Sequence, residues 1–173
     1  PRERSVRGGR LFQTPLRELE ALRHPLLRRE SLAFSGPLHL EGLAGRRLDL
    51  ELAVRPAEGK ELRSFVLRLA EGEGLHTDLC YRPYERTLRL DRSRSGSRRA
   101  LLHAQDCLVR GSSGLLKLRV VLDSYSVEVF INDGEQVMSA VFYTDLSADG
   151  ISFAADGDAV MDLKAFSLAE DGG

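Results

Sequence analysis

Hydrophobic and polar residues alternate over most of the chain from residue 31 onward, the pattern of β-strands with one buried face. The clearest run is 48–54, where leucines and a valine alternate with Asp49, Glu51 and Ala53. The same pattern predicts further strands at 65–69, 88–91, 116–122, 127–131, 137–143, 151–154 and 160–168. About ten short strands without crossover helices predict an all-β fold, a two-sheet antiparallel β-sandwich of the lectin-like jelly-roll kind.

Two turns are predicted between these strands. Asn132-Asp133-Gly134 lies between two alternating runs, and these residue types accept the positive φ angles of a tight hairpin. The segment 155–158, Ala-Asp-Gly-Asp, predicts a turn between the last two strands.

Helical spacing is limited to Pro15–Arg23, where Leu16, Leu19 and Leu22 recur behind Thr14 as a candidate N-cap. Pro25 stops the pattern after about two turns, which is too short for stability without packing. We therefore predict three parts: residues 1–13 as a separate piece able to form a small hairpin, 14–30 as a linker with a short helix, and 31–173 as the β-sandwich domain.

Composition excludes several classes of protein. The chain has 173 residues, 42% of them hydrophobic and 29% charged, with a net charge of -1, so no overall field favours nucleic acid or membranes. No apolar run reaches the length of a membrane span, and the first residues have no signal-peptide pattern. One basic cluster has two readings, a polyanion contact or a solvated loop: Arg92, Arg94, Arg98 and Arg99.

The sequence gives little support for a metal site or a catalytic nucleophile. Cys80 and Cys107 form no metal-binding pattern and are predicted to be buried free thiols. No G-x-S-x-G segment or phosphate-binding glycine loop occurs. The four histidines are isolated in sequence, and a ligand role for His39 or His76 stays open beside a surface role: His24, His39, His76 and His103.

Carboxylates are numerous, but in the strand alternation they occupy the positions that point away from the core. Asp49, Glu51 and Glu128 are predicted to lie on a solvated face rather than to form a catalytic pair, and Asp91 and Asp123 to cap turns. The chain has no Trp, so sugar stacking would depend on four tyrosines that are also expected at strand ends: Tyr81, Tyr84, Tyr125 and Tyr143. We predict no catalytic, cofactor-binding or metal-binding residue in this chain, and no cofactor.

Four segments, in order, resemble glycoside hydrolase family 32. Residues 122–135 are similar to the "D-x-S-S-V-E-V-F-x-N-D-G" hairpin of that family's C-terminal sandwich, with a departure at Tyr125, where the family has a small or polar residue. Residues 88–96 resemble "L-x-L-D-R-S-x-S-G", and 11–19 resemble the linker "L-x-Q-x-P-V-x-E-L". Residues 1–11 resemble the hairpin that closes the last propeller blade.

The resemblance implies a parent enzyme in which a five-bladed catalytic β-propeller precedes this sandwich and hydrolyses terminal β-fructofuranosides with retention. Residues 1–13 would then be a remnant of the last propeller strands. The family's catalytic motifs W-x-N-D-P-N-G, R-D-P and E-C are absent, so this chain alone is predicted to be inactive.

Three functions stay open at this point. The leading one is a non-catalytic accessory module that stabilises the propeller and aids oligomerisation, with the propeller and a homodimer partner as contacts and without nucleic acid or membrane. The alternative is an independent, lectin-like module for fructans, and the third is an enzyme in its own right. The parent's substrate stays open among sucrose, sucrose-6-phosphate, levan and inulin, and a bacterial cytoplasmic location is expected.

Overall fold

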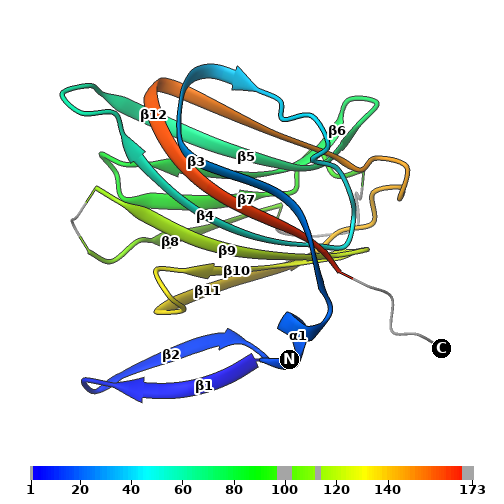
Figure 1. Cartoon of the computed structure of the whole chain (residues 1–173), viewed down its shortest axis with the longest axis horizontal. Coiled ribbons are helices and arrows are strands. Elements are labelled where there is room, and N and C mark those ends of the chain that lie inside the picture. The colour runs from blue at the N-terminus through cyan, green and yellow to red at the C-terminus, as the bar shows by residue number, and fades with distance from the viewer. Residues whose placement is uncertain (1, 97–102, 112–113, 169–173) are drawn as a thin grey trace.

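The structure, a computed structural model, describes residues 2–96, 103–111 and 114–168. It is built almost entirely of β-strands (Figure 1). Within these ranges no helix has the length and apolar character needed to cross a membrane. The elements in chain order are β1 (Arg2–Arg7), β2 (Arg10–Pro15), α1 (Glu18–Ala21), β3 (Arg23–Leu38), β4 (Leu48–Pro56), β5 (Leu62–Gly72), β6 (Leu75–Arg82), β7 (Thr87–Asp91), β8 (Ala104–Leu108), β9 (Leu116–Asp123), β10 (Ser126–Ile131), β11 (Gln136–Val141) and β12 (Gly150–Leu168).

Strands β3 to β12 form one antiparallel network that folds into two facing layers (Figure 1). The first half of β12 pairs with β5, and its second half pairs with β4. One layer continues from β4 through β9 and β10 to β11, and the other from β5 through β6 and β7 to β8. Strand β3 lies along the other edge of β12. The predicted all-β antiparallel sandwich is confirmed.

Strand β12 corrects one prediction, because residues 155–158 do not separate two strands. They bend a single strand, with a shift of pairing register between Ala155 and Ala159. Gly157 permits the bend: its φ is +105°, and a Cβ there would lie 2.2 Å from the Glu61 carbonyl oxygen. This bend allows one strand to pair in both layers.

The segment 14–30 also differs from expectation. Helix α1 spans only Glu18–Ala21, its N-cap is Arg17 without a side-chain cap, and Thr14 belongs to β2. Residues 23–30, expected as linker, form the first half of β3 and pair with β12. The strand was missed because it lies at an edge with most side chains partly exposed, so it has no buried alternating face.

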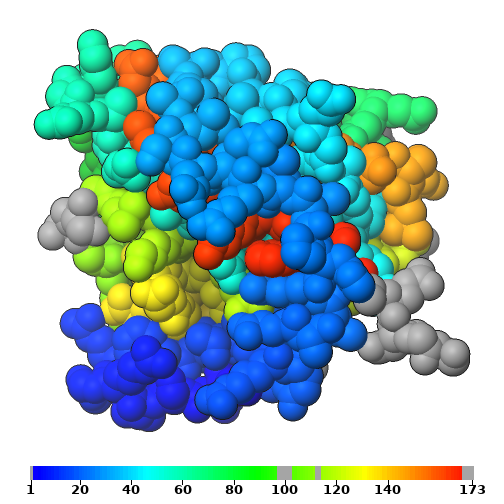
Figure 2. Space-filling model, viewed as in Figure 1, coloured from blue at the N-terminus to red at the C-terminus, as the bar shows by residue number. Residues whose placement is uncertain are grey.

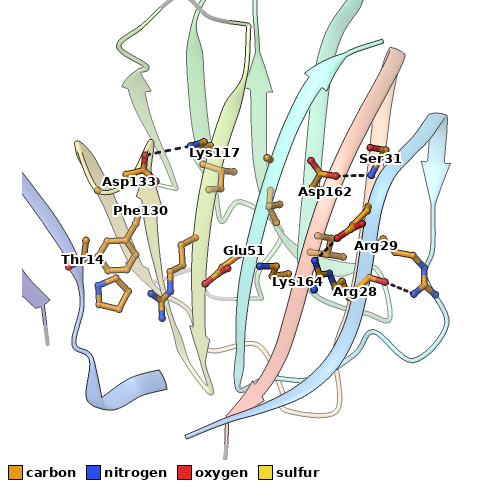
Figure 3. A pocket seen from close by; sticks show the side chains of 18 of the residues that line it. Thr14, Arg28, Arg29, Ser31, Glu51, Lys117, Phe130, Asp133, Asp162 and Lys164 are labelled. Carbon is orange, nitrogen blue, oxygen red and sulfur yellow. Dashed lines mark hydrogen bonds and ion pairs between the residues drawn. The ribbon is translucent and has the colours of Figure 1, made fainter. Parts of the chain in front are cut away.

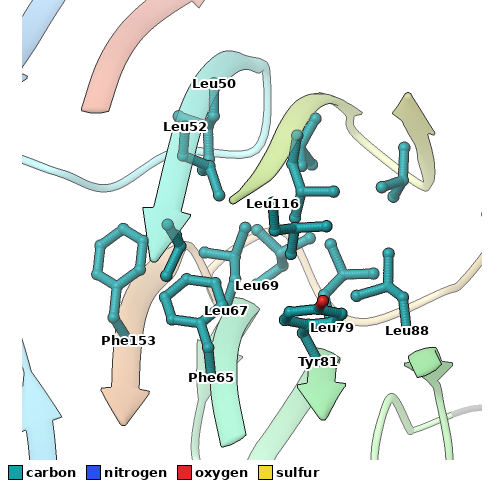
Figure 4. Packing of buried hydrophobic residues seen from close by; sticks show 14 of the residues in the cluster. Leu50, Leu52, Phe65, Leu67, Leu69, Leu79, Tyr81, Leu88, Leu116 and Phe153 are labelled. Carbon is teal, nitrogen blue, oxygen red and sulfur yellow. The ribbon is translucent and has the colours of Figure 1, made fainter. Parts of the chain in front are cut away.

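The core lies between the two layers and follows the predicted alternation. Leucines 48, 50 and 52 of β4 and Val54 are at most 4% exposed. Leu50 and Leu52 face side chains of β5, β6 and β12 across the sandwich (Figure 4). Phe65 and Phe153 pack with ring centroids 6.3 Å apart, and Phe34 of β3 meets Phe65 edge-on at 6.5 Å. Burial of these apolar side chains is the main stabilising contribution to the fold.

The far edges of the two layers are β8 and β11, and side chains connect them. Gln136 Nε2 donates to the Leu108 carbonyl at 2.7 Å, and Gln105 Nε2 donates to the Ser139 carbonyl at 3.1 Å. These bonds satisfy carbonyl groups that an open edge would leave without a ladder partner. The sandwich is therefore partly closed at this side.

Candidate functional site

The N-terminal hairpin β1–β2 lies against the sandwich at β10 and its turn, along the lower side of the molecule in Figure 2. Gln13 N–H donates to the Gly134 carbonyl at 2.9 Å, and Arg2 Nε donates to Glu128 at 2.7 Å. A Cβ on Gly134 would stand 1.9 Å from the Gln13 carbonyl oxygen. The predicted turn at 132–134 is thus present, and its glycine also allows the hairpin to approach closely.

A groove of about 830 Å³ lies beside this hairpin, over the outer face of β9, β4 and β12 (Figure 3). Charged side chains from five strands and one turn line it, and the apolar ring of Phe130 lies at its hairpin side. The basic members are Arg7, Arg28, Arg29, Lys117, Arg119 and Lys164, and the acidic members are Glu30, Glu51, Asp133 and Asp162.

The acidic side chains of the groove are already engaged. Glu30 accepts from Arg28, Glu51 accepts from Arg23 at 2.7 Å, and Lys117 Nζ lies 3.7 Å from Asp133. Asp162 accepts the Ser31 backbone N–H at 2.7 Å. A retaining glycosidase needs one carboxylate free to attack the sugar and a second carboxyl free to donate a proton. The groove has the features of a salt-bridged contact surface.

Asp49 corrects the expectation of a solvated face, since its side chain is fully buried. Arg23 Nε donates to it at 2.7 Å, and Arg119 donates twice, at 2.8 and 3.1 Å. We call Arg23, Asp49, Glu51 and Arg119 the Asp49 network. Glu128 is likewise covered, at 27% exposure, where Arg2 of the hairpin binds it. Strand phase predicted the outer face correctly, but arginine side chains cover the two carboxylates: Arg23 and Arg119 at Asp49, and Arg2 at Glu128.

The Asp49 network holds the linker onto the sandwich. Arg23 is the first residue of β3, and its guanidinium lies 4.3 Å from the centroid of the Phe166 ring. Burial opposes its charge, but the bonds to Asp49 and Glu51 outweigh this effect and raise the pKa of Arg23. Arg119 also reaches Glu20 of α1, at 3.7 Å. The path from the hairpin to β3 is therefore fixed by ion pairs.

The histidines and cysteines form no shared site. His76 Nδ1 lies 3.0 Å from Asp78 Oδ1, and His39 is exposed. No group of three potential metal ligands occurs in the part of the chain that the structure describes. Cys80 and Cys107 are free and half-buried, and burial raises the pKa of both thiols. They therefore stay protonated at neutral pH and are poor nucleophiles.

Two other expectations have mixed outcomes. Asp91 accepts the Ser93 N–H at 2.8 Å, as predicted for a turn cap, whereas Asp123 lies 3.6 Å from Arg47. Of the basic cluster, Arg92 donates to the Val141 carbonyl and Arg94 is exposed. Arg98 and Arg99 lie outside the described residues, so the two readings of the cluster stay open.

The tyrosines separate into three environments. Tyr81 is buried, and Tyr84 is 71% exposed in the turn between β6 and β7. Tyr125 and Tyr143 lie together, with ring centroids 6.2 Å apart. The sequence contained a signal for this pair, since the hairpin predicted at 132–134 pairs Ser126 with Val141 and so brings their neighbours together.

Comparison with known proteins decides the family. The model for "Glycosyl hydrolases family 32 C terminal" matches residues 18–169. The chain belongs to this family of C-terminal domains. The motifs at 88–96 and 122–135 are the end of β7 with the loop that follows it, and the β9–β10 hairpin with its following turn. Residues 1–17, which include the whole hairpin β1–β2, precede the matched region.

Relatives of the C-terminal domain are parts of longer chains. A levanase of Bacillus sp. (strain L7) is 33% identical over 168 residues, which are 91% of this chain and 18% of the levanase. A sucrose-6-phosphate hydrolase of Staphylococcus xylosus is 31% identical over 156 residues, 90% of this chain and 31% of that protein. The chain thus spans less than a third of the length of either relative.

Solved structures share the fold. The exo-inulinase from Aspergillus awamori superposes with a TM-score of 0.85 at 20% identity, over 98% of this chain and 35% of that chain. Fructan 1-exohydrolase IIa from Cichorium intybus gives a TM-score of 0.79 at 17% identity, over 98% of this chain and 40% of that chain. At these identities the likeness describes the fold alone.

Proposed function

We propose that this chain is the non-catalytic C-terminal domain of a β-fructofuranosidase and that it stabilises a catalytic β-propeller in the same polypeptide. The observation that carries the proposal is the docked hairpin β1–β2, which precedes the family match and bonds to β10 and its turn. The relatives named levanase and sucrose-6-phosphate hydrolase, in which the matched region is a minor part, support a larger enzyme. We call that larger enzyme the parent enzyme.

The outward face of the hairpin supports a further domain beyond it. Val6 and Leu11 are cross-strand partners, so their side chains lie on the same face, and they are 71% and 51% exposed. A two-stranded hairpin is marginally stable unless other strands or a neighbouring layer cover it. Propeller strands packed on this face would bury both side chains, and the hairpin would then connect propeller and sandwich.

The substrate class of the parent enzyme follows from the names of its relatives. We infer that it hydrolyses terminal β-fructofuranosides, with levan, sucrose-6-phosphate, sucrose and inulin as the compounds to compare. The acidic side chains of the groove are engaged in ion pairs and hydrogen bonds, which supports the proposal that the chemistry lies in a preceding propeller. A W-x-N-D-P-N-G motif encoded upstream of Pro1 is the first expected result.

The test of the stabilising role uses the hairpin face. In the parent enzyme, Val6→Glu with Leu11→Glu is expected to shorten the half-life of fructose release at elevated temperature, because two charges would enter the interface. Tyr84→Glu is the matched control, since Tyr84 is as exposed as Val6 but lies outside the hairpin. Equal half-lives for the two variants, or the absence of a catalytic domain upstream, would overturn the proposal.

The same face supports self-association of the chain when no propeller is joined to it. Exposed aliphatic side chains on a hairpin promote contact with a second copy. We expect sedimentation of the 173-residue chain to show a dimer that Val6→Glu with Leu11→Glu converts to monomer. A monomer at all concentrations would remove the dimer from the proposal.

A further inference from the structure

A pair of exposed aromatic rings lies at the end of the sandwich opposite the hairpin turn. Tyr125 precedes β10 and Tyr143 follows β11, whereas Gly134, which meets the N-terminal hairpin, lies at the other end of these strands. The six residues of β10 separate the two ends by roughly 20 Å. Along β10 the nearest contact of the hairpin is Arg2 with Glu128, so the pair lies beyond the contacts that the hairpin makes with this strand.

The rings are accessible and close to one another. Tyr125 is 43% exposed and Tyr143 is 68% exposed, with centroids 6.2 Å apart and an interplanar angle of 37°. Two neighbouring rings with a shallow angle between them present a continuous aromatic surface.

The backbone under the pair is held in place by a buried arginine. Arg46 is 7% exposed, and its guanidinium donates to carbonyls on both tyrosine-bearing segments: to Ser124 on one side, and to Thr144 at 3.1 Å and Asp145 at 2.7 Å on the other. Its guanidinium carbon lies 5.9 Å from the centroid of the Tyr125 ring. One buried charge thus connects the two turns that carry the rings.

Two further bonds fix the same segments. Phe142 N–H donates to the Tyr125 carbonyl at 2.8 Å, and the Phe142 side chain is fully buried in the hydrophobic core. Thr144 Oγ1 donates to the Ser95 carbonyl at 2.6 Å in a buried position. Rings on a backbone held this firmly lose little conformational freedom when a ligand binds.

The rings carry polar groups of their own. Each tyrosine carries a hydroxyl that can donate and accept. Asp145, two residues after Tyr143, is exposed, and its carboxylate accepts the N–H and Oγ of Ser147 at 2.9 and 2.7 Å, bonds that hold the pKa of Asp145 below its ordinary value. An aromatic surface that carries two hydroxyls, with a charged acceptor two residues further along the chain, matches a ligand with C–H faces and hydroxyl edges.

Sugar rings have that chemistry. Their C–H faces pack on aromatic rings, and their hydroxyls bond to polar groups at the edge of the stack. We propose that Tyr125 and Tyr143 form a platform that binds a fructan chain, at a site separate from catalysis. The choice of fructan over other sugar polymers rests on the proposed function; the platform itself rests on the geometry of the two rings.

The test is the mobility of the 173-residue chain in native gels that contain levan or inulin, with dextran as the unrelated polymer. Levan or inulin is expected to retard the chain. Tyr143→Ala and Tyr125→Ser should each weaken the retardation about tenfold, as loss of an aromatic anchor does. Tyr143→Phe keeps the ring and is expected to retain binding, which separates stacking from a general change in structure.

Tyr84→Ala is the matched control, because Tyr84 is 71% exposed in a turn at the opposite end. Val109 N–H donates to the Arg86 carbonyl in that turn, and Asn132 Nδ2 donates to the carbonyl of the next residue, Arg110. The turn therefore lies toward the end of β10 that meets the N-terminal hairpin. Circular dichroism and a melting curve for each variant establish that it is folded, and a variant that fails is replaced by Tyr125→Leu or Tyr143→Leu.

Four results would overturn the proposal. The first three are the absence of retardation by either fructan, equal retardation by dextran, and platform variants that bind as well as Tyr84→Ala. A fourth is loss of a dimer in sedimentation for Tyr143→Ala with unchanged retardation, which would make the pair a protein contact. The heat-inactivation test of the hairpin face does not depend on any of these four results. If the platform proposal fails, that test still decides whether the domain stabilises the propeller.

Discussion

Replacing Asp49 with asparagine removes a negative charge from a fully buried position between two arginines. The side chain keeps its shape, so no cavity forms. The Asn amide would point N–H donors at a guanidinium, and the three bonds that Asp49 now accepts at 2.7, 2.8 and 3.1 Å could not all survive. Both arginines would have to share one neutral acceptor, the Asn carbonyl oxygen, in place of a charged carboxylate.

The size of the effect depends on the carboxylate partners that each arginine retains. Loss of one partner from a buried ion pair costs about 3–5 kcal/mol. Arg23 and Arg119 are 13% and 19% exposed, and each retains another carboxylate, Glu51 at 2.7 Å and Glu20 at 3.7 Å. We therefore expect the lower end of the range, a loss of about 3 kcal/mol in the free energy of unfolding.

Urea unfolding of the chain measures this loss, followed by circular dichroism at low and high salt. Asp106→Asn is the matched control, because Asp106 accepts two bonds from Arg89 at 2.7 and 2.9 Å on an exposed surface. That variant is expected to keep nearly the unfolding midpoint of the unmodified chain, since surface pairs contribute little. High salt should leave the Asp49→Asn loss largely unchanged, because buried pairs are screened weakly.

Two results would refute this reasoning. One is an Asp49→Asn midpoint equal to that of Asp106→Asn. The other is a double-mutant cycle of Asp49→Asn with Arg119→Met that shows no coupling, which would mean that the network has no net effect on stability.

Three further predictions concern the hairpin, the thiols and the core. Gly134→Ala should undock β1–β2 and speed proteolysis near residue 16, whereas Gly59→Ala, at a similar positive φ with open space around it, should not. Cys80 and Cys107 should react with Ellman's reagent more slowly than glutathione at pH 7.5, and faster only as the pH rises toward their raised pKa values; fast reaction at pH 7.5 would contradict their burial. Phe65→Ala should cost about 3–5 kcal/mol in urea unfolding, and a loss below about 1 would contradict the packing of Figure 4.

Much of the fold could be predicted from alternation alone, because a strand with one buried face must alternate. The run at 48–54 and the hairpin at 132–134 are in place for this reason. Strand β3 could not be predicted in the same way, since an edge strand with Pro25 in it and partly exposed faces follows no such pattern. In the sequence, the bend of β12 looks like a turn because a glycine such as Gly157 is typical of both.

The candidate site was harder to predict because it depends on long-range cover. Alternation placed Asp49 on the outer face of β4, which is correct, but the side chains of Arg23 and Arg119 bind the carboxylate there and it is buried. Tyr125 and Tyr143 were considered separately, although the predicted hairpin register would have joined them. Alternation describes one strand at a time, whereas both sites bring together side chains from different strands and turns.

The most direct test of the central claim is fructose release by the purified 173-residue chain beside the parent enzyme, with sucrose, sucrose-6-phosphate, levan and inulin as substrates. We expect the parent enzyme to release fructose from at least one of them and the chain to release none above a blank. Fructose released by the chain alone, and lost on Glu51→Gln, would contradict it.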